Sequence, residues 1–136
     1  MRATKDPIRV LVVEDTAEIR ELLRALLQEE GYKVVLAADG FQAVDELSQG
    51  DPSLVLLDLA LPGMDGIALL RWMAANQGTK GIPVIVVSAS AKSIPAEARG
   101  QVSYILEKPF ELNELLSKVD SAVRPSMVGP AARAGH

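Results

Sequence analysis

The stretch LVLLDLALPGMDG, residues 54–66, decides how this chain is expected to fold. Four apolar residues, Leu54–Leu57, lead directly into Asp58, and the turn-forming pair Pro62 and Gly63 follows. A short, fully apolar run of this kind is typical of a strand that is buried on both faces. A carboxylate at the end of such a strand costs free energy unless a partner compensates its charge. We therefore expect the groups that meet Asp58 to indicate the function.

A second apolar run ends on acids near the N-terminus, in IRVLVVED at residues 8–15. Similar runs alternate along the chain with segments whose apolar residues recur at helical spacing, as Ile19, Leu23 and Leu26 do. The Glu and Arg residues between them are expected to form a solvated helix face. The whole pattern predicts strands at 8–13, 33–37, 54–57, 82–87 and 103–106, and helices at 16–31, 39–50, 65–78, 91–100 and 110–123. Pro95 makes the fourth helix short.

Alternating strands and helices predict an α/β fold, because two parallel strands need a crossover connection between them. The result is a doubly wound five-stranded parallel sheet with helices on both faces. We expect the flavodoxin-like strand order 2-1-3-4-5, which places the strands at 8–13, 54–57 and 82–87 side by side. Ligands bind such sheets at the carboxyl ends of the strands, beside the point where the strand order reverses.

Polar side chains follow the strands at this edge: Glu14 and Asp15 after the first strand, Asp58 after the third, Ser88 after the fourth and Lys108 after the fifth. Three crowded carboxylates repel one another unless a cation joins them. Oxygen ligands without His or Cys suit Mg²⁺ better than Zn²⁺. An Asp carboxylate can also act as a nucleophile and form an aspartyl-phosphate. Mg²⁺, Lys108 and Ser88 would then neutralise or hydrogen-bond the phosphoryl oxygens.

These residues also have plain structural interpretations. Asp58 can be a turn residue, and Ser88, taken alone, is more often a turn or cap residue than a ligand. Glu14 and Asp15 are acids near a helix start, where the helix dipole favours negative charge. The shared position of Asp58, the other two acids and Lys108 at one edge of the sheet favours the chemical interpretation.

The composition of the chain excludes several classes of protein and of functional site. The chain has 136 residues, which suits one domain, and it has no Cys, so disulfides and thiolate metal sites are excluded. Its single His is His136, which removes His-based triads. The net charge is −4 and no dense Lys/Arg cluster occurs, so direct binding to nucleic acid is not expected. No signal peptide or membrane span is apparent, and a cytoplasmic location is expected.

Four motifs identify a family. They are VED at 13–15, LLDLALPGMDG at 56–66, VVSA at 86–89 and KPF at 108–110, each at the end of an expected strand. With these motifs the chain resembles the receiver domain of bacterial two-component response regulators. The resemblance covers about residues 8–123, so residues 1–7 are expected to be an N-terminal extension and residues 124–136 a flexible tail.

The resemblance implies that Asp58 accepts a phosphoryl group from a histidine kinase or a histidine phosphotransfer protein. It implies that Glu14 and Asp15 hold Mg²⁺ together with Asp58, Glu14 partly through water. The backbone carbonyl of Ala60 is implied as a further metal ligand. A receiver of this kind catalyses its own phosphotransfer and slow dephosphorylation and is a signalling module rather than an enzyme with a separate substrate.

Further roles are implied at the fourth and fifth strands. Ser88 would move toward the phosphoryl group, Lys108 would pair with it, and the bond from Lys108 to Pro109 would be cis. Receivers often carry an aromatic switch residue three positions before the lysine, but this chain has Ile105 there and Tyr104 one residue earlier. A one-residue bulge in the strand would bring Tyr104 to the switch face, and without it Tyr104 points the other way.

Several alternatives stay open at this stage. The switch module would act on a downstream protein through the face formed by 91–100, 103–106 and 110–123, which is also where receivers often form homodimers. It would be either a single-domain regulator or a receiver from a longer chain. A pseudo-receiver that is never phosphorylated is a second class. A dehalogenase-like hydrolase is disfavoured because Ala60 replaces its second Asp, and a flavin carrier because the loop VEDTAE at 13–18 is acidic.

Overall fold

The computed structural model describes residues 7–89 and 94–123. Within them, five parallel strands form one sheet in the order β2-β1-β3-β4-β5, which confirms the expected fold. The strands are β1 (Arg9–Val13), β2 (Lys33–Ala37), β3 (Leu54–Leu57), β4 (Val84–Ser88) and β5 (Val102–Glu107). The helices are α1 (Ala17–Glu29), α2 (Gly40–Gln49), α3 (Gly66–Ala75), α4 (Ala96–Arg99) and α5 (Leu112–Val123). The expected extension, apart from Pro7, and the expected tail with His136 lie outside the described residues.

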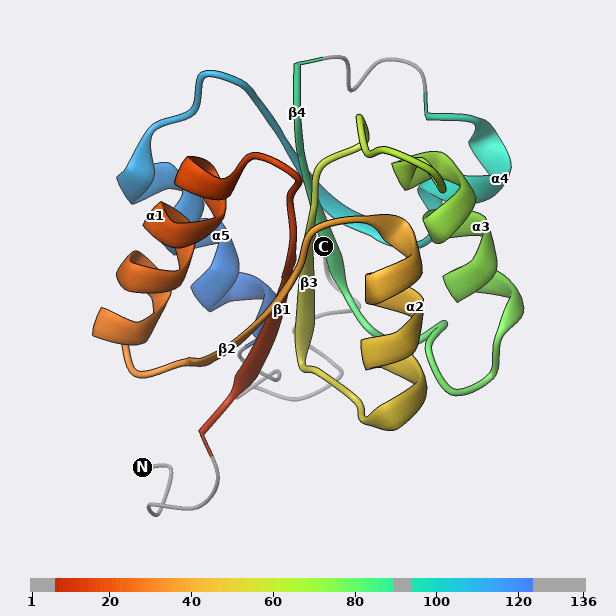
Figure 1. The fold of residues 1–136 in the computed structure, drawn as a ribbon, viewed down its shortest axis with the longest axis horizontal. Coiled ribbons are helices and arrows are strands. Elements are labelled where there is room, and N and C mark those ends of the chain that lie inside the picture. The colour runs from red at the N-terminus through yellow and green to blue at the C-terminus, as the bar shows by residue number, and fades with distance from the viewer. Residues whose placement is uncertain (1–6, 90–93, 124–136) are drawn as a thin grey trace, which may run out of the picture.

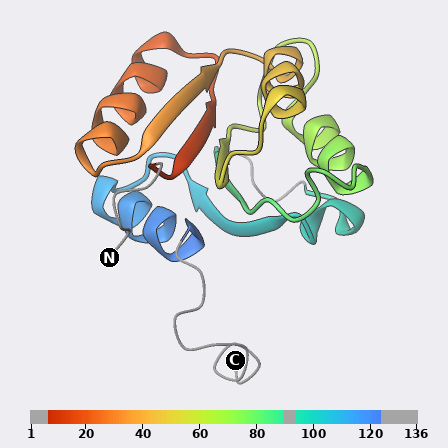
Figure 2. The same ribbon diagram turned by 90° about the horizontal axis from the view of Figure 1, so that it is seen from below.

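The helices form two layers around the sheet. Helices α1 and α5 cover one face, and α2, α3 and α4 cover the other (Figures 1 and 2). Alternate residues of each strand enter the two layers, so Val84 and Val86 of β4 lie in the cluster under α2–α4, while Ile85 and Val87 lie in the cluster under α1 and α5. β1, β3 and β4 are buried on both sides, so apart from Arg9 and Ser88 their sequences are the apolar runs from which they were predicted.

Local signals set where the helices begin and end. Asp39 caps α2 by accepting a hydrogen bond from the Gln42 amide, and Asp65 caps α3 through the Ala68 amide, each at 2.8 Å. Thr16 precedes α1, and Gly31 follows it with a φ of +96°, a conformation that favours glycine. Helices α1, α2 and α3 therefore start at the carboxyl edge of the sheet, where the polar residues were expected to meet (Figure 1).

Two of the boundaries that differ from the expected ones are explained by prolines. Strand β4 begins at Val84 rather than residue 82, after Pro83, which has no amide hydrogen to give to a ladder. Helix α4 was expected over 91–100, and its described part is the single turn Ala96–Arg99 after Pro95. The residue before a proline is driven out of the helical region, so the helix begins only beyond Pro95. Residues 90–93 lie outside the description.

Candidate phosphorylation site

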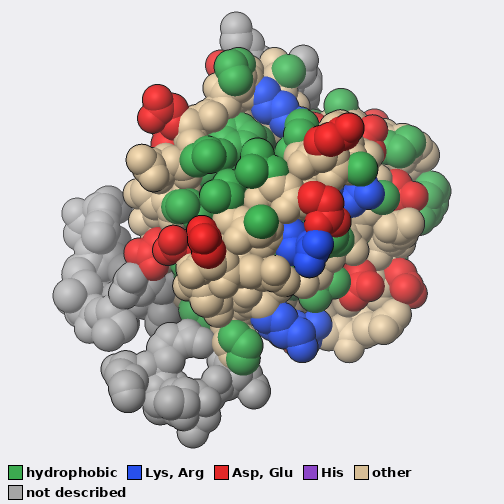
Figure 3. Space-filling view, turned by 60° about the vertical axis from the view of Figure 1, so that its left-hand side comes forward, with side chains coloured by type: hydrophobic (Ala, Val, Ile, Leu, Met, Phe, Trp, Pro, Cys, Tyr) green, Lys and Arg blue, Asp and Glu red, His purple; other side chains and the backbone are tan. Residues whose placement is uncertain are grey.

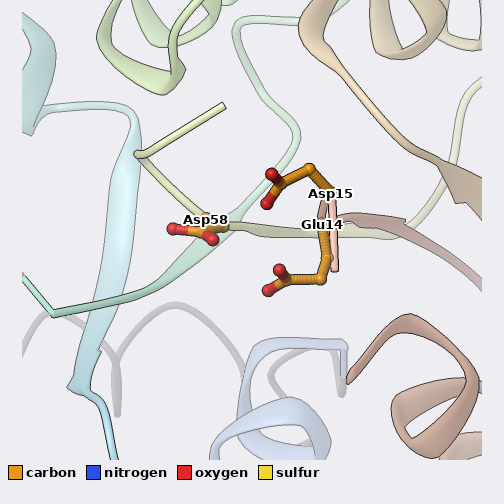
Figure 4. A group of neighbouring side chains, drawn as sticks. All are labelled: Glu14, Asp15 and Asp58. Atoms are coloured by element: carbon orange, nitrogen blue, oxygen red, sulfur yellow. The ribbon is translucent and has the colours of Figure 1, made fainter. Parts of the chain in front are cut away.

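The sheet register brings the acidic residues of β1 and β3 together. Val13 and Leu57 are partners in the ladder, and the Asp58 amide donates to the Val13 carbonyl at 3.0 Å. Glu14, Asp15 and Asp58 each offer a carboxylate oxygen, and these three oxygens lie within 4.8 Å of one another. In Figure 4 the three carboxylates face one shared space. The structure therefore brings together the three acids that the sequence placed at neighbouring strand ends.

Lys108 is the counter-ion inside this cluster. Its Nζ lies 3.1 Å from Glu14 Oε1 and 3.1 Å from Asp58 Oδ2. The Lys108 side chain is 23% exposed, while those of Glu14 and Asp58 are only 3% and 7% exposed. Desolvation acts to lower the pKa of Lys108, but hydrogen bonds to Asp58 and Glu14 and the charges of both outweigh it, so this pKa is raised above 10.5. The ammonium therefore stays charged at neutral pH.

Main-chain amides hold the remaining oxygens of the two buried acids. Glu14 Oε2 accepts from the Thr16 amide at 3.1 Å, and Asp58 Oδ1 accepts from the Ala60 amide at 3.1 Å. Together with Lys108, these contacts fix both carboxylates in one orientation. The amide of Ala60 therefore contacts Asp58 directly. The carbonyl of the same residue is the one that was expected to serve as a metal ligand.

The strand ends that carry Ser88 and Lys108 are also in register. Ser88 is buried as the last residue of β4, and its carbonyl accepts from the Lys108 amide at 3.1 Å. By strand alternation the Ser88 side chain is on the side of Val86, toward the α2–α4 layer. The Lys108–Pro109 peptide bond is cis, as expected.

Strand β5 contains the bulge that was considered for Tyr104, but the bulge has the opposite outcome. Val84 pairs with Val102 and Ile85 with Tyr104, so Ser103 is the extra residue. Tyr104 then packs against the cluster under α1 and α5, with Lys118 Nζ 5.0 Å from the centroid of its ring. This is the face opposite the Ser88 side chain, and it argues against Tyr104 as the aromatic switch. Ile105, paired with Val86, is 42% exposed.

Glycines let the loop after Asp58 pack closely, a feature that the sequence alone did not reveal. A Cβ added at Gly66 would lie 2.5 Å from the Leu59 Cα and 3.0 Å from the Asp58 carbonyl. A Cβ at Gly40, in the first turn of α2, would lie 2.5 Å from the Met64 carbonyl. Real Cβ atoms do not approach so closely, so both glycines are required by the space around them. The backbone that follows Asp58 is therefore held closely by its neighbours.

We expect Gly66→Ala to destabilise the protein by about 3 kcal/mol, because the added methyl group meets main-chain atoms that cannot move aside cheaply. Urea denaturation of the variant and the wild type measures this difference. Gly78→Ala is the matched control, since nothing lies within 4 Å of a Cβ at Gly78. We expect it to change the free energy of unfolding by less than about 0.5 kcal/mol. Equal effects of the two substitutions would contradict the close packing at Gly66.

The acid cluster has the donor set of a magnesium site. Its ligands are carboxylate oxygens, and the described residues offer no His or Cys near it. Hard oxygen donors of this kind select Mg²⁺ over Zn²⁺. The residues present therefore fit the cation that the sequence predicted.

Among the described helices, none is long and apolar enough to cross a membrane.

Solved structures of receiver domains share this fold. The response regulator TrrA from Thermotoga maritima, solved in complex with Mg²⁺ and BeF, has a TM-score of 0.75 and 32% identity over 84% of this chain and 97% of that chain. The receiver domain of sensor histidine kinase PA1611 from Pseudomonas aeruginosa PAO1 has a TM-score of 0.78 and 29% identity over 87% of this chain and 98% of that chain. That structure has a magnesium ion coordinated in its active-site cleft.

Curated relatives agree with the structural neighbours. The DNA-binding response regulator MtrA of Mycobacterium tuberculosis is 36% identical over 126 residues, which are 90% of this chain and 54% of that protein. Response regulator MprA of Mycobacterium sp. (strain KMS) is 35% identical over 118 residues, 87% of this chain and 51% of that protein. This chain spans about half the length of these relatives. The family profile described as "Response regulator receiver domain" matches residues 10–120. The chain therefore belongs to the response regulator receiver family of two-component signal transduction.

Proposed function

We propose that Asp58 is the phosphoacceptor of a phosphorylation-dependent switch formed by residues 8–123. One observation carries this proposal: a single ammonium, Lys108, bridges Asp58 and Glu14, with the Asp15 carboxylate beside them. A nucleophilic carboxylate, a fixed cation and two further acids are the parts that phosphoryl transfer to an aspartate needs. The donor is proposed to be a histidine kinase or a histidine phosphotransfer protein.

In this reaction an Asp58 oxygen forms the new bond to phosphorus, and the bond from phosphorus to the donor's imidazole nitrogen breaks. The electron pair of that bond stays with the imidazole, whose other ring nitrogen carries a proton, so the ring leaves neutral. Before transfer the Ala60 amide and Lys108 orient the Asp58 carboxylate through Oδ1 and Oδ2. After transfer the Lys108 ammonium pairs with a phosphoryl oxygen, and the Ser88 hydroxyl hydrogen-bonds another.

Glu14, Asp15, Asp58 and the Ala60 carbonyl would hold Mg²⁺, with Glu14 acting partly through water. When bound, this ion supplies positive charge that neutralises the phosphoryl oxygens during transfer. The acids themselves repel an incoming phosphoryl group, so Lys108 is the only side chain in the cluster, among the described residues, that favours its arrival without the metal. Slow hydrolysis of the aspartyl-phosphate then returns the switch to its resting state.

Two surfaces are proposed for partners. Figure 3 views the side of the molecule with α1 and α5, where hydrophobic side chains gather and Lys and Arg are interspersed with Asp and Glu. Leu22 of α1 and Leu112 of α5 are 45% and 40% exposed, and the phosphodonor is proposed to dock on this side. A downstream protein, or a second copy in a homodimer, is proposed to use the α4–β5–α5 face, where Ile105 is exposed. No direct contact of this segment with nucleic acid is proposed.

Intact-mass measurement after incubation with Mg²⁺ and acetyl phosphate tests the proposal. We expect the mass of one phosphoryl group to be added, and EDTA to prevent the addition. Borohydride reduction converts an aspartyl-phosphate to homoserine, so peptide mapping should then find homoserine at position 58. A chain that takes up no phosphoryl group and does not bind beryllofluoride would instead be a pseudo-receiver that acts as a constitutive interaction module.

A further inference from the structure

Arg20 connects the first helix to the loop that carries two of the site's acids. It lies one turn into α1, where its amide donates to the Thr16 carbonyl at 2.9 Å. Its guanidinium Nη1 donates to the Glu14 carbonyl at 2.8 Å and to the Asp15 carbonyl at 3.2 Å. The Nη1 group carries two hydrogens, so each carbonyl can receive one. One side-chain nitrogen therefore holds two consecutive peptide groups of the β1–α1 loop.

Two other described arginines of the helices use their charge in ion pairs, while Arg99 of α4 donates to the Ile94 carbonyl at 3.2 Å. Arg24, one turn further along α1, pairs with Glu21, and Arg71 of α3 pairs with Glu97 of α4. Arg20 makes no ion pair within the described residues, although the same loop carries the carboxylates of Glu14 and Asp15 and that of Asp58 lies close to them. Its charge is directed instead at main-chain oxygens, and charge-assisted hydrogen bonds of this kind are stronger than neutral ones.

The carboxylates of Glu14 and Asp15 differ in the number of contacts that fix their orientation. The Glu14 carboxylate is fixed by Lys108 and by the Thr16 amide. The Asp15 carboxylate is exposed and accepts no hydrogen bond from residues 7–89 or 94–123. Its direction therefore depends on its own main chain, which Arg20 holds at the Glu14 and Asp15 carbonyls and the Glu14 carboxylate holds at the Thr16 amide.

We propose that Arg20 is a positioning residue for the cation site: it orients the peptide groups of Glu14 and Asp15 so that the Asp15 carboxylate faces Asp58 before the metal arrives. The inference rests on the proposed function, because it assigns a role toward the same cation. Groups that orient metal ligands from outside typically contribute about 10- to 100-fold to metal affinity.

The sign of one measured change separates this role from a purely electrostatic one. A positive charge near three carboxylates opposes the binding of a divalent cation, so its removal alone would strengthen binding. Loss of a positioning group would weaken binding, because the cation must then order the loop itself. Removal of Arg20 therefore has opposite expected effects under the two roles.

The experiment measures Mn²⁺ affinity, using the electron paramagnetic resonance signal of free Mn²⁺, for wild type, Arg20→Met, Arg20→Lys and the control Arg24→Met. Mn²⁺ prefers the same oxygen ligands as Mg²⁺. We expect Arg20→Met to weaken binding about 10-fold or more, Arg20→Lys to recover part of the loss, and Arg24→Met to stay within about twofold of wild type. Unchanged or tighter binding by Arg20→Met, or an equal loss in Arg24→Met, would overturn the positioning role.

A second measurement, amide hydrogen exchange without metal, accompanies the Mn²⁺ affinities. The Thr16 amide donates to Glu14 Oε2, so its hydrogen exchange in EDTA reports the order of the loop. We expect exchange at Thr16 to be about 10-fold faster in Arg20→Met, while amides in the buried part of α1, such as that of Leu27, exchange as in wild type and show that the fold is intact. Equal exchange at Thr16 in wild type and Arg20→Met would count against the proposal.

The two proposals fail in different ways. If wild type itself bound no Mn²⁺, the proposed cation site would be wrong. If wild type bound Mn²⁺ and Arg20→Met bound it equally well, only the positioning role of Arg20 would be wrong.

Discussion

The Asp58→Asn variant is expected to take up no phosphoryl group from acetyl phosphate in the presence of Mg²⁺. An asparagine side chain has nearly the same shape, and its amide oxygen can still accept the hydrogen bond from the Ala60 amide, although its NH2 group, in place of Oδ2, cannot accept from Lys108. It lacks the carboxylate oxygen that forms the acyl-phosphate bond. We expect the rate of phosphorylation, measured by intact mass over time, to fall by at least about 10³-fold.

Asp65→Asn is the matched control for this substitution. Asp65 lies in the same loop, is exposed, and caps α3 through the Ala68 amide, a role that asparagine performs equally well. We expect Asp65→Asn to be phosphorylated at the wild-type rate. Retention of the adduct in Asp58→Asn would assign the chemistry to another residue, and loss of it in both variants would point to the loop rather than to the nucleophile.

The sequence predicted most of this site because parallel strands impose a simple geometry. Glu14, Asp15, Asp58 and Lys108 each follow a strand at its carboxyl end, and these ends meet at one edge whenever the strands are parallel. Burial of β1 and β3 on both faces made their sequences continuous apolar runs, so their ends could be read within a residue. Four side chains from three distant segments could therefore be placed together from local patterns alone.

The features that escaped prediction depend on contacts between segments without a local pattern. Arg20 occupies a helix position that looks solvated, and only the path of the β1–α1 loop reveals that it bonds two carbonyls. In the sequence Gly66 looks like an ordinary turn glycine, and only the structure shows that the Leu59 backbone packs closely against it.

A one-residue bulge in the fifth strand was considered as a way to redirect Tyr104, but its position, at Ser103, depends on how β5 pairs with β4. Strand propensity does not encode that register, because a single extra residue reverses which side chains face each layer. Tyr104 consequently packs under α5 rather than beside Ser88.

A second large effect is expected on removal of the ammonium that joins the buried acids. In Lys108→Met, Glu14 and Asp58 keep their main-chain hydrogen bonds but lose their only counter-ion in the described residues. Removing one partner of a fully buried pair costs about 3–5 kcal/mol. Lys108 retains some solvent exposure, so we expect a loss of about 2–3 kcal/mol in the free energy of unfolding, measured by urea denaturation in EDTA.

Mg²⁺ is expected to stabilise Lys108→Met more than it stabilises wild type. The Lys108 ammonium neutralises the same carboxylates that would bind the metal and repels a second cation there. Saturating Mg²⁺ should therefore raise the free energy of unfolding more in Lys108→Met than in wild type, because ligand binding stabilises a protein in proportion to the logarithm of its affinity. Lys80→Met, which removes an exposed lysine with no ion pair among the described residues, should change neither quantity. An equal gain from Mg²⁺ in wild type and Lys108→Met would mean that the ammonium and the metal occupy separate places, and that the lysine does not act on the cation site.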